Sequence, residues 1–224
     1  MSGETKFPPF HTLDFVLKKV QVTLAEFHGL RLTPVDELSV EERKVIKQIR
    51  DAVPAPTSDT WMQKVIPIEY IERYLRGEWW AVGGCLTKAA DVRGVTMPKD
   101  VFNSLRLDYK DTPYTKKTDY GLIKFKTDQT DQIYIPYHKK FGDPVNVKHE
   151  ISYPQTGNGF TASENGTVIP EYETPWGVFL DPEDGAELYR VANGEELLIG
   201  IFDERKERFV PMQSTKRVRR IFNG

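Results

Sequence analysis

Residues 188–202 read Leu-Tyr-Arg-Val-Ala-Asn-Gly-Glu-Glu-Leu-Leu-Ile-Gly-Ile-Phe, and this stretch decides the fold class. Asn193-Gly194 is a turn dipeptide, because both residues adopt positive φ at low cost. Apolar runs lie on either side of it, at 188–192 and 197–202, so the pattern predicts a β-hairpin. The second run has no polar alternation, which indicates a central strand covered on both faces.

Alternating apolar residues predict further strands before the hairpin. Ile123 and Phe125 alternate with Lys124, and Ile133 and Ile135 enclose Tyr134 in the same way. A final strand or short helix is expected in residues 210–222. From Tyr120 onward the chain is therefore expected to be rich in strands.

The first third of the chain carries helical patterns instead. Apolar residues between 13 and 27 recur every three or four positions, which predicts an amphipathic helix. Ser39 followed by Glu42 is a capping box and predicts the start of a second helix. A third helix is expected over residues 67–77 and a fourth over residues 99–105.

The proline-rich stretch 53–58 (Val-Pro-Ala-Pro-Thr-Ser) separates the first two helices from the rest of the chain. Residues before proline are pushed toward extended conformations, so we place the main boundary here. Residues 1–60 are expected to form a helical N-terminal region, and residues 61–224 an α+β domain. Helices first and strands later predict an α+β fold with a mainly antiparallel sheet.

Composition excludes several classes of protein. The chain has 224 residues, of which 39% are hydrophobic and 29% charged, as in globular proteins. Its 31 basic residues nearly balance its 33 acidic ones, which disfavours binding to nucleic acid or anionic lipid through a global field. Cys85 is the only cysteine, so internal disulfides and multi-cysteine metal sites are excluded, and we expect no metal site.

No stretch of the sequence has the length and apolar composition of a membrane span. The segment Met1 to Phe10 also lacks the apolar core of a signal peptide. We therefore expect a cytoplasmic protein, or one that is secreted without a cleaved signal peptide.

Two segments carry residues suited to holding a ligand. Residues 154–163 (Pro-Gln-Thr-Gly-Asn-Gly-Phe-Thr-Ala-Ser) combine two glycines, which permit close backbone approach, with hydroxyl groups. The alternative is a surface loop that enters a strand. Arg106 stands among apolar residues and could offer its forked donors to a phosphate or carboxylate. Its alternatives are an internal ion pair with Asp108 and an exposed charge at a helix end.

Two pairs of glutamates could supply a catalytic carboxylate. The pairs are Glu171 with Glu173, and Glu195 with Glu196. A glutamate at the mouth of a cleft can stabilise an oxocarbenium-like transition state by its negative charge. For either pair, the alternative is a solvated residue in a turn.

The order of these segments resembles that of bacterial ADP-ribosyltransferase toxin domains. In both, an arginine is followed by an aromatic residue with a Thr/Ser group, and then by a glutamate. The resemblance implies a toxin or effector domain that takes NAD as its substrate and cleaves the nicotinamide–ribose bond. A protein target or a cognate immunity protein would be its partner. The residues that the resemblance implies for NAD binding are Arg106, Phe160, Thr161 and Ser163, and those for catalysis are Glu196 or Glu173.

The sequence departs from the pattern of that family at two positions. Ala162 stands in the centre of the Thr/Ser group, where the family has a hydroxyl residue. Glu195 and Glu196 are adjacent, whereas Glu171 and Glu173 have the one-residue spacing of the family. The choice of catalytic glutamate stays open for this reason.

Other classes of function are compatible with the sequence. A non-catalytic interaction module, such as an immunity or adaptor protein, would use the aromatic-rich strands as a partner surface. A metal-independent nuclease could use His138 or His149 as a general base beside the lysines at 139–140. The basic run 216–220 could contact nucleic acid or an acidic partner.

Overall fold

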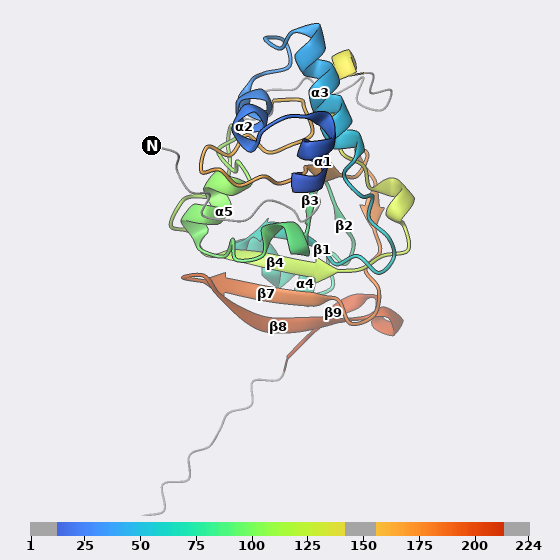
Figure 1. Cartoon of the computed structure of the whole chain (residues 1–224). Coiled ribbons are helices and arrows are strands. Elements are labelled where there is room, and N and C mark those ends of the chain that lie inside the picture. The colour runs from blue at the N-terminus through green and yellow to red at the C-terminus, as the bar shows by residue number, and fades with distance from the viewer. Residues whose placement is uncertain (1–12, 142–155, 213–224) are drawn as a thin grey trace, which may run out of the picture.

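The computed structural model describes residues 13–141 and 156–212 and has helices first and strands later (Figure 1). The α-helices are α1 (Leu13–Val20), α2 (Leu24–Leu32), α3 (Val40–Asp51), α4 (Ile71–Leu75) and α5 (Pro98–Ser104). The strands are β1 (Met62–Pro67), β2 (Val82–Gly83), β3 (Cys85–Lys88), β4 (Tyr120–Phe125), β5 (Tyr172–Glu173), β6 (Phe179–Leu180), β7 (Glu187–Ala192), β8 (Glu195–Asp203) and β9 (Arg208–Pro211). Short 3-10 turns are η1 (Ile68–Tyr70), η2 (Ala89–Val92), η3 (Thr130–Gln132), η4 (Lys139–Phe141) and η5 (Glu204–Lys206).

Seven of the strands form one antiparallel sheet in the order β5-β3-β1-β4-β7-β8-β9, and β2 pairs with β6 in a second sheet. The α+β fold with a mainly antiparallel sheet is therefore confirmed. In the large sheet, Gln63 of β1 pairs with Thr87 of β3 on one side and with Lys124 of β4 on the other. Since residues directly opposite each other in paired strands point to the same side, these three residues belong to the same face of the sheet.

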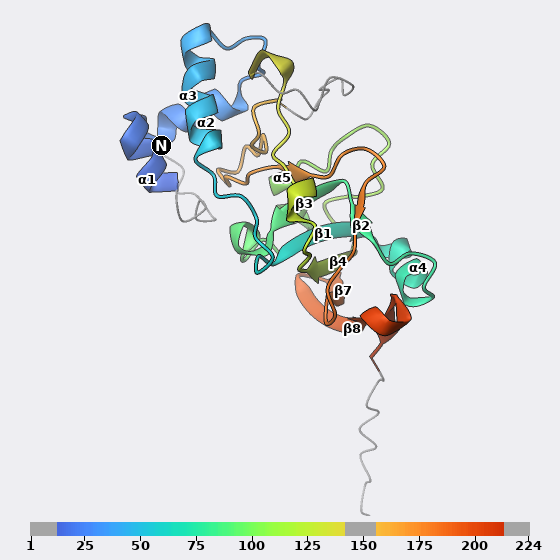
Figure 2. The ribbon, with the colours of Figure 1, turned by 90° about the vertical axis from the view of Figure 1, so that its right-hand side faces the viewer.

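The two faces of the large sheet have different cover (Figures 1 and 2). On one face, Ile123 and Phe125 of β4 pack with Ile71 and Tyr74 of α4 in an apolar core. On the other, β4 packs with residues of η2 and α5. The helices α1, α2 and α3 lie together at one end of the molecule, beyond α5. The face under η2 and α5 is the one to which Gln63, Thr87 and Lys124 belong.

The predicted helix over residues 13–27 is wrong in one respect, because the structure breaks it into α1 and α2. Gln21 adopts a left-handed φ of 57° at the break. Thr23 then caps α2: its hydroxyl accepts a hydrogen bond from the Glu26 amide, and the Glu26 carboxylate accepts one from the Thr23 amide. This capping box satisfies backbone amides that have no partner within the helix at the start of α2. The box predicted at Ser39 and Glu42 is confirmed at the start of α3.

The predicted hairpin is confirmed as β7 and β8, with Asn193 and Gly194 at φ of 51° and 81° in the turn. The helices expected over 67–77 and 99–105 correspond to η1 with α4 and to α5. The strand predicted around Ile123 is confirmed as β4, and β9 lies at the start of the element expected over 210–222. Residues 213–222 lie outside the described range.

Two predicted features of the strands are wrong. Residues 133–137 form no strand beyond a single bridge between Tyr134 and Glu173, and η3 occupies the positions just before them. Strand β8 is not covered on both faces, since Leu197 is 63% exposed. Only the second half of β8 is well packed, where Phe202 lies edge-to-face with Phe209 at 5.3 Å.

The N-terminal helices share an apolar core with a distant part of the chain. Phe27 of α2 packs edge-to-face on Phe160, with ring centroids 5.1 Å apart. Phe141 and Val168 belong to the same cluster. Residues 1–60 and 61–224, which the sequence separates, are thus joined by packing in the part that the structure describes.

Candidate active site

A cavity of about 420 Å³ lies beside strands β1, β3 and β5 of the large sheet. Its lining brings together Arg106, Thr161, Glu171 and Glu173, which come from separate segments of the sequence. Tyr109 and Tyr114 add aromatic area to the wall. The volume suits a small-molecule ligand, and several polar groups converge on it.

Arg106 follows α5 and reaches the cavity from a left-handed backbone conformation with φ of 50°. Its guanidinium donates to both carboxylate oxygens of Asp108, at 2.9 and 3.0 Å, and to the Ala162 carbonyl at 2.6 Å. The internal ion pair that the sequence offered as an alternative is therefore present. Because the side chain is only 14% exposed, the pair also fixes the direction of a positive charge at the cavity wall.

Thr161 lines the same cavity and carries a fully buried hydroxyl. The residue is 4% exposed, and its backbone amide donates to the Ile169 carbonyl at 2.9 Å. Its Oγ1 has no hydrogen-bond partner in residues 13–141 and 156–212. An unpaired buried hydroxyl costs about 1–3 kcal/mol.

Glu171 and Glu173, at the β5 edge of the sheet, are held differently. Glu173 pairs with Cys85 of β3, and its Oε1 accepts a hydrogen bond of 2.9 Å from the Tyr134 hydroxyl. Backbone hydrogen bonds between Tyr134 and Glu173 fix the same position. Burial raises the pKa of Glu171 to about 7, the charge of Glu173 adds to the rise, and Arg106 opposes it. Glu171 thus exchanges its proton near neutral pH, as a general base does.

Replacing Glu171 with glutamine should stabilise the protein at pH 8 and have little effect at pH 4. The folded state holds the Glu171 proton up to about pH 7, whereas the unfolded chain loses it near its ordinary pKa of 4.5. Ionisation therefore costs stability as the pH rises between these two values, about 3 kcal/mol in all. Denaturant unfolding of both proteins from pH 4 to pH 8 measures the difference. A constant difference in the free energy of unfolding across this range would contradict the assignment.

Three of the residues predicted for the site lie elsewhere. Phe160 is fully buried against Phe27 in the helical core. Ser163 is also fully buried, and its hydroxyl donates to the Thr167 carbonyl. Glu196 of β8 forms an ion pair with Lys124 in a different cavity.

The glycine-rich segment is not a surface loop, since residues 156–163 are all buried. Gly159 has a φ of 89°, and a β-carbon there would come within 2.8 Å of Ile135 and 2.9 Å of Arg50. The absence of a side chain at Gly159 thus lets this segment pack closely against Ile135 and Arg50 of the protein itself. Asn158, fully buried, accepts from the Phe160 amide and donates to the Arg31 carbonyl.

Arg31 of α2 is a residue that the sequence patterns did not single out. Its side chain is fully buried and donates to the Thr161 and Ser163 carbonyls, both at 2.7 Å. Burial lowers the pKa of Arg31 to about 10, so the group stays charged at neutral pH. In the sequence it is a basic residue in the last turn of a helix, where arginine is common for other reasons.

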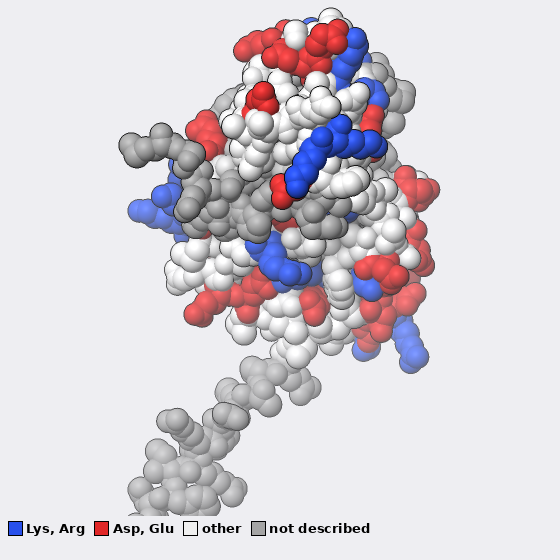
Figure 3. Space-filling model, in the orientation of Figure 1, with Lys and Arg blue, Asp and Glu red and all other residues white. Residues whose placement is uncertain are grey.

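His138 does not line the cavity, and its Nδ1 accepts a hydrogen bond from the Lys140 amide at 3.2 Å. His149 and the basic run 216–220 lie outside the described residues. In the described part of the chain, no cluster of three or more histidine, cysteine, aspartate or glutamate side chains could hold a metal ion. Basic and acidic side chains are both present on the face that Figure 3 shows.

Comparison with protein-family models, with curated proteins and with solved structures finds no match to this chain. None of the helices within 13–141 and 156–212 is long and apolar enough to cross a membrane.

Proposed function

We propose that the protein is an NAD-consuming enzyme of ADP-ribosyltransferase type, a toxin or effector domain that cleaves the nicotinamide–ribose bond. The observation that carries the proposal is the lining of one cavity by Arg106, Thr161 and Glu173. These are an arginine, a hydroxyl of the Thr/Ser group and a glutamate, in the order that the family pattern requires. Glu173 rather than Glu196 is the catalytic glutamate in this proposal, because Glu196 lines a different cavity.

The cavity supplies charges of the sign that NAD requires. The Arg106 guanidinium, which is ion-paired with Asp108, brings a positive charge to the diphosphate, and Thr161 lies in the same wall. Tyr109 and Tyr114 offer rings against which a planar heterocycle can pack. In this proposal Arg106 faces the negative diphosphate of NAD, and Glu173 faces the positive charge that develops at ribose C1′.

The reaction needs one negative charge and one base. When the bond between ribose C1′ and nicotinamide breaks, its electron pair leaves with nicotinamide and C1′ becomes positive. The Glu173 carboxylate, oriented by Tyr134, stabilises that charge. Water or an acceptor then bonds to C1′, and ionised Glu171 takes the proton that it loses. With water, the products are ADP-ribose, nicotinamide and a proton.

NAD should stabilise the protein against thermal unfolding, by about 2.7 kcal/mol when its concentration is about a hundred times the dissociation constant. Arg106→Ala should weaken NAD binding at least about tenfold, since it removes a partly buried charge. Arg76→Ala is the matched control, because Arg76 is exposed and forms an ion pair with Glu78 at the surface. Calorimetric titration with NAD checks both variants. Absence of any stabilisation at millimolar NAD would overturn the proposal.

A second candidate function is a non-catalytic interaction module, and one observation favours it. Trp176 is 89% exposed and Phe179 is 62% exposed, in the segment that directly follows Glu173. Large exposed apolar side chains of this kind are typical of partner contacts. They would suit a protein target or a cognate immunity protein beside the cavity. If this candidate is correct, Trp176→Ala should lose binding to the partner, and millimolar NAD should stabilise neither Trp176→Ala nor the original protein.

A further inference from the structure

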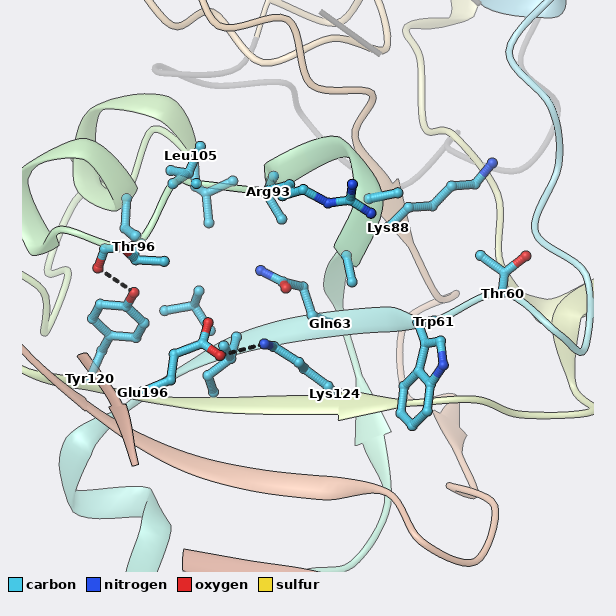
Figure 4. A pocket seen from close by; sticks show the side chains of 18 residues that line it. Thr60, Trp61, Gln63, Lys88, Arg93, Thr96, Leu105, Tyr120, Lys124 and Glu196 are labelled. Atoms are coloured by element: carbon cyan, nitrogen blue, oxygen red, sulfur yellow. Dashed lines mark hydrogen bonds and ion pairs between the residues drawn. The ribbon is translucent and has the colours of Figure 1, made fainter. Parts of the chain in front are cut away.

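A second cavity of about 490 Å³ adjoins the candidate active site on the same face of the sheet. Gln63, Val65 and Leu105 line both cavities, so the two are neighbours across β1. Figure 4 shows the second cavity between η2 and α5 above and strands β1 and β4 below. Nothing in the proposed NAD chemistry uses it.

The charges around this cavity favour an anion. Lys88, Arg93 and Lys124 line it, against Glu196 as the only acidic side chain in its described lining. Lys124 is paired with Glu196, and the Lys88 ammonium donates to the Pro54 carbonyl. Arg93 is exposed at the wall and has no ion-pair partner in the described part of the chain. A guanidinium in this position can bind a phosphate with two parallel hydrogen bonds.

Gln63 is the strongest indication that a ligand belongs here. The residue is only 7% exposed, and its side chain has no hydrogen-bond partner among residues 13–141 and 156–212. Figure 4 shows its amide directed into the cavity, between Arg93 and Lys124. A carboxamide offers both a donor and an acceptor to the edge of a heterocyclic base.

The rest of the lining is apolar and suits a flat ring. Val92, Val95 and Leu122 contribute aliphatic wall, and Trp61, which is 42% exposed, stands at one end (Figure 4). Bases stack well on tryptophan, and aliphatic side chains cover their faces. An inorganic anion would leave this apolar volume unused, and a fatty acyl chain would bury the Gln63 amide without partners.

We propose that this cavity binds a nucleoside monophosphate group, with the phosphate on Arg93, the base edge on Gln63 and the base against Trp61. The group can belong to a free nucleotide or to the nucleotide half of a dinucleotide. A free nucleotide and the nucleotide half of a dinucleotide present the same phosphate and base to this cavity.

Calorimetric titration with AMP, GMP, CMP and UMP tests the proposal directly. At least one nucleotide should bind, and Arg93→Ala should weaken it about tenfold or more. Arg205→Ala removes the same charge from the exposed turn η5 and should leave the affinity unchanged. If none of the four binds at millimolar concentration, or if both variants weaken binding equally, the proposal is wrong.

Gln63→Leu separates a role in binding from a role in folding. Leucine has a similar size, and the Gln63 side chain makes no hydrogen bond within residues 13–141 and 156–212 that the change would break, so the melting temperature should stay the same or rise. Nucleotide affinity should fall about tenfold, because the base edge loses its hydrogen bonds. A lower melting temperature with unchanged affinity would show that Gln63 is structural and would overturn its assignment.

Adding NAD distinguishes the two sources of the nucleotide. If NAD and the nucleotide displace each other and both depend on Arg93, the cavity holds half of a dinucleotide. If they bind together, it holds a free nucleotide. Nucleotide binding is also measured in Glu173→Gln, where the proposed NAD cleavage is lost and the second cavity is intact. Failure of the proposed enzyme function therefore leaves this test unaffected.

Discussion

Glu173→Gln should lower the rate of NAD cleavage by about 10² to 10³, with little change in NAD binding. Glutamine keeps the size of the side chain and can still accept a hydrogen bond from Tyr134. It removes the negative charge that opposes the positive charge developing on C1′. Because that charge exists only in the transition state, the loss should appear in kcat. Release of nicotinamide from NAD measures it.

Glu196→Gln is the matched control for this experiment. Glu196 is ion-paired with Lys124 in the neighbouring cavity and does not line the one that contains Arg106. The same chemical change there should leave the cleavage rate within about twofold, since a partly exposed ion pair contributes little. A large loss in Glu196→Gln together with full activity in Glu173→Gln would reverse the assignment of the two glutamates.

Arg31→Ala should destabilise the protein by about 3 kcal/mol or more. The substitution leaves the carbonyls of Thr161 and Ser163 buried without their donors, and it opens space between α2 and the segment 156–163. Denaturant unfolding gives the change in free energy. Cleavage activity should fall as well, because Arg31 positions the Thr161 backbone at the wall of the cavity.

Two further variants test the reason for this loss. Arg31→Met restores most of the volume and should still lose stability, since methionine cannot donate to the two carbonyls. Lys44→Ala removes an exposed charge from α3 and should change stability by less than about 0.5 kcal/mol. If Arg31→Met were as stable as the original protein, packing rather than hydrogen bonding would explain the role of Arg31.

Local signals in the sequence were sufficient for several elements. Asn193-Gly194 predicts the β7–β8 turn because few other dipeptides adopt two positive φ angles at low cost. Ser39 and Glu42 predict the start of α3 because the capping box closes within four residues. Thr23 and Glu26 form the same kind of capping box. This second box was not predicted, because the apolar residues from 13 to 27 fit the period of one continuous helix.

Patterns that depend on neighbouring strands were less informative. The apolar run at 197–202 indicates burial on both faces, yet Leu197 is 63% exposed. Whether a strand is buried on both faces depends on which helices and loops pack over the sheet, and the sequence of the strand does not contain that information. Apolar residues do alternate around Tyr134, but this residue forms only an isolated β-bridge to Glu173, and its hydroxyl donates a hydrogen bond to the Glu173 carboxylate. Periodicity reports which side chains are apolar and not which strands pair.

The sequence by itself determined the order of helices and strands, the α+β class and the chemical types of Arg106, Thr161 and Glu173. Only the tertiary structure decided that these three share a cavity with Glu171 and that Glu196 lies in another. Their meeting depends on the pairing of β5 with β3 and on the contact of Arg106 with Ala162. The tertiary structure likewise decided the burial of Arg31 and Gln63. Hydrogen-bond partners and exposure arise from contacts between segments that are distant in the sequence, and such contacts leave no periodic pattern in the chain.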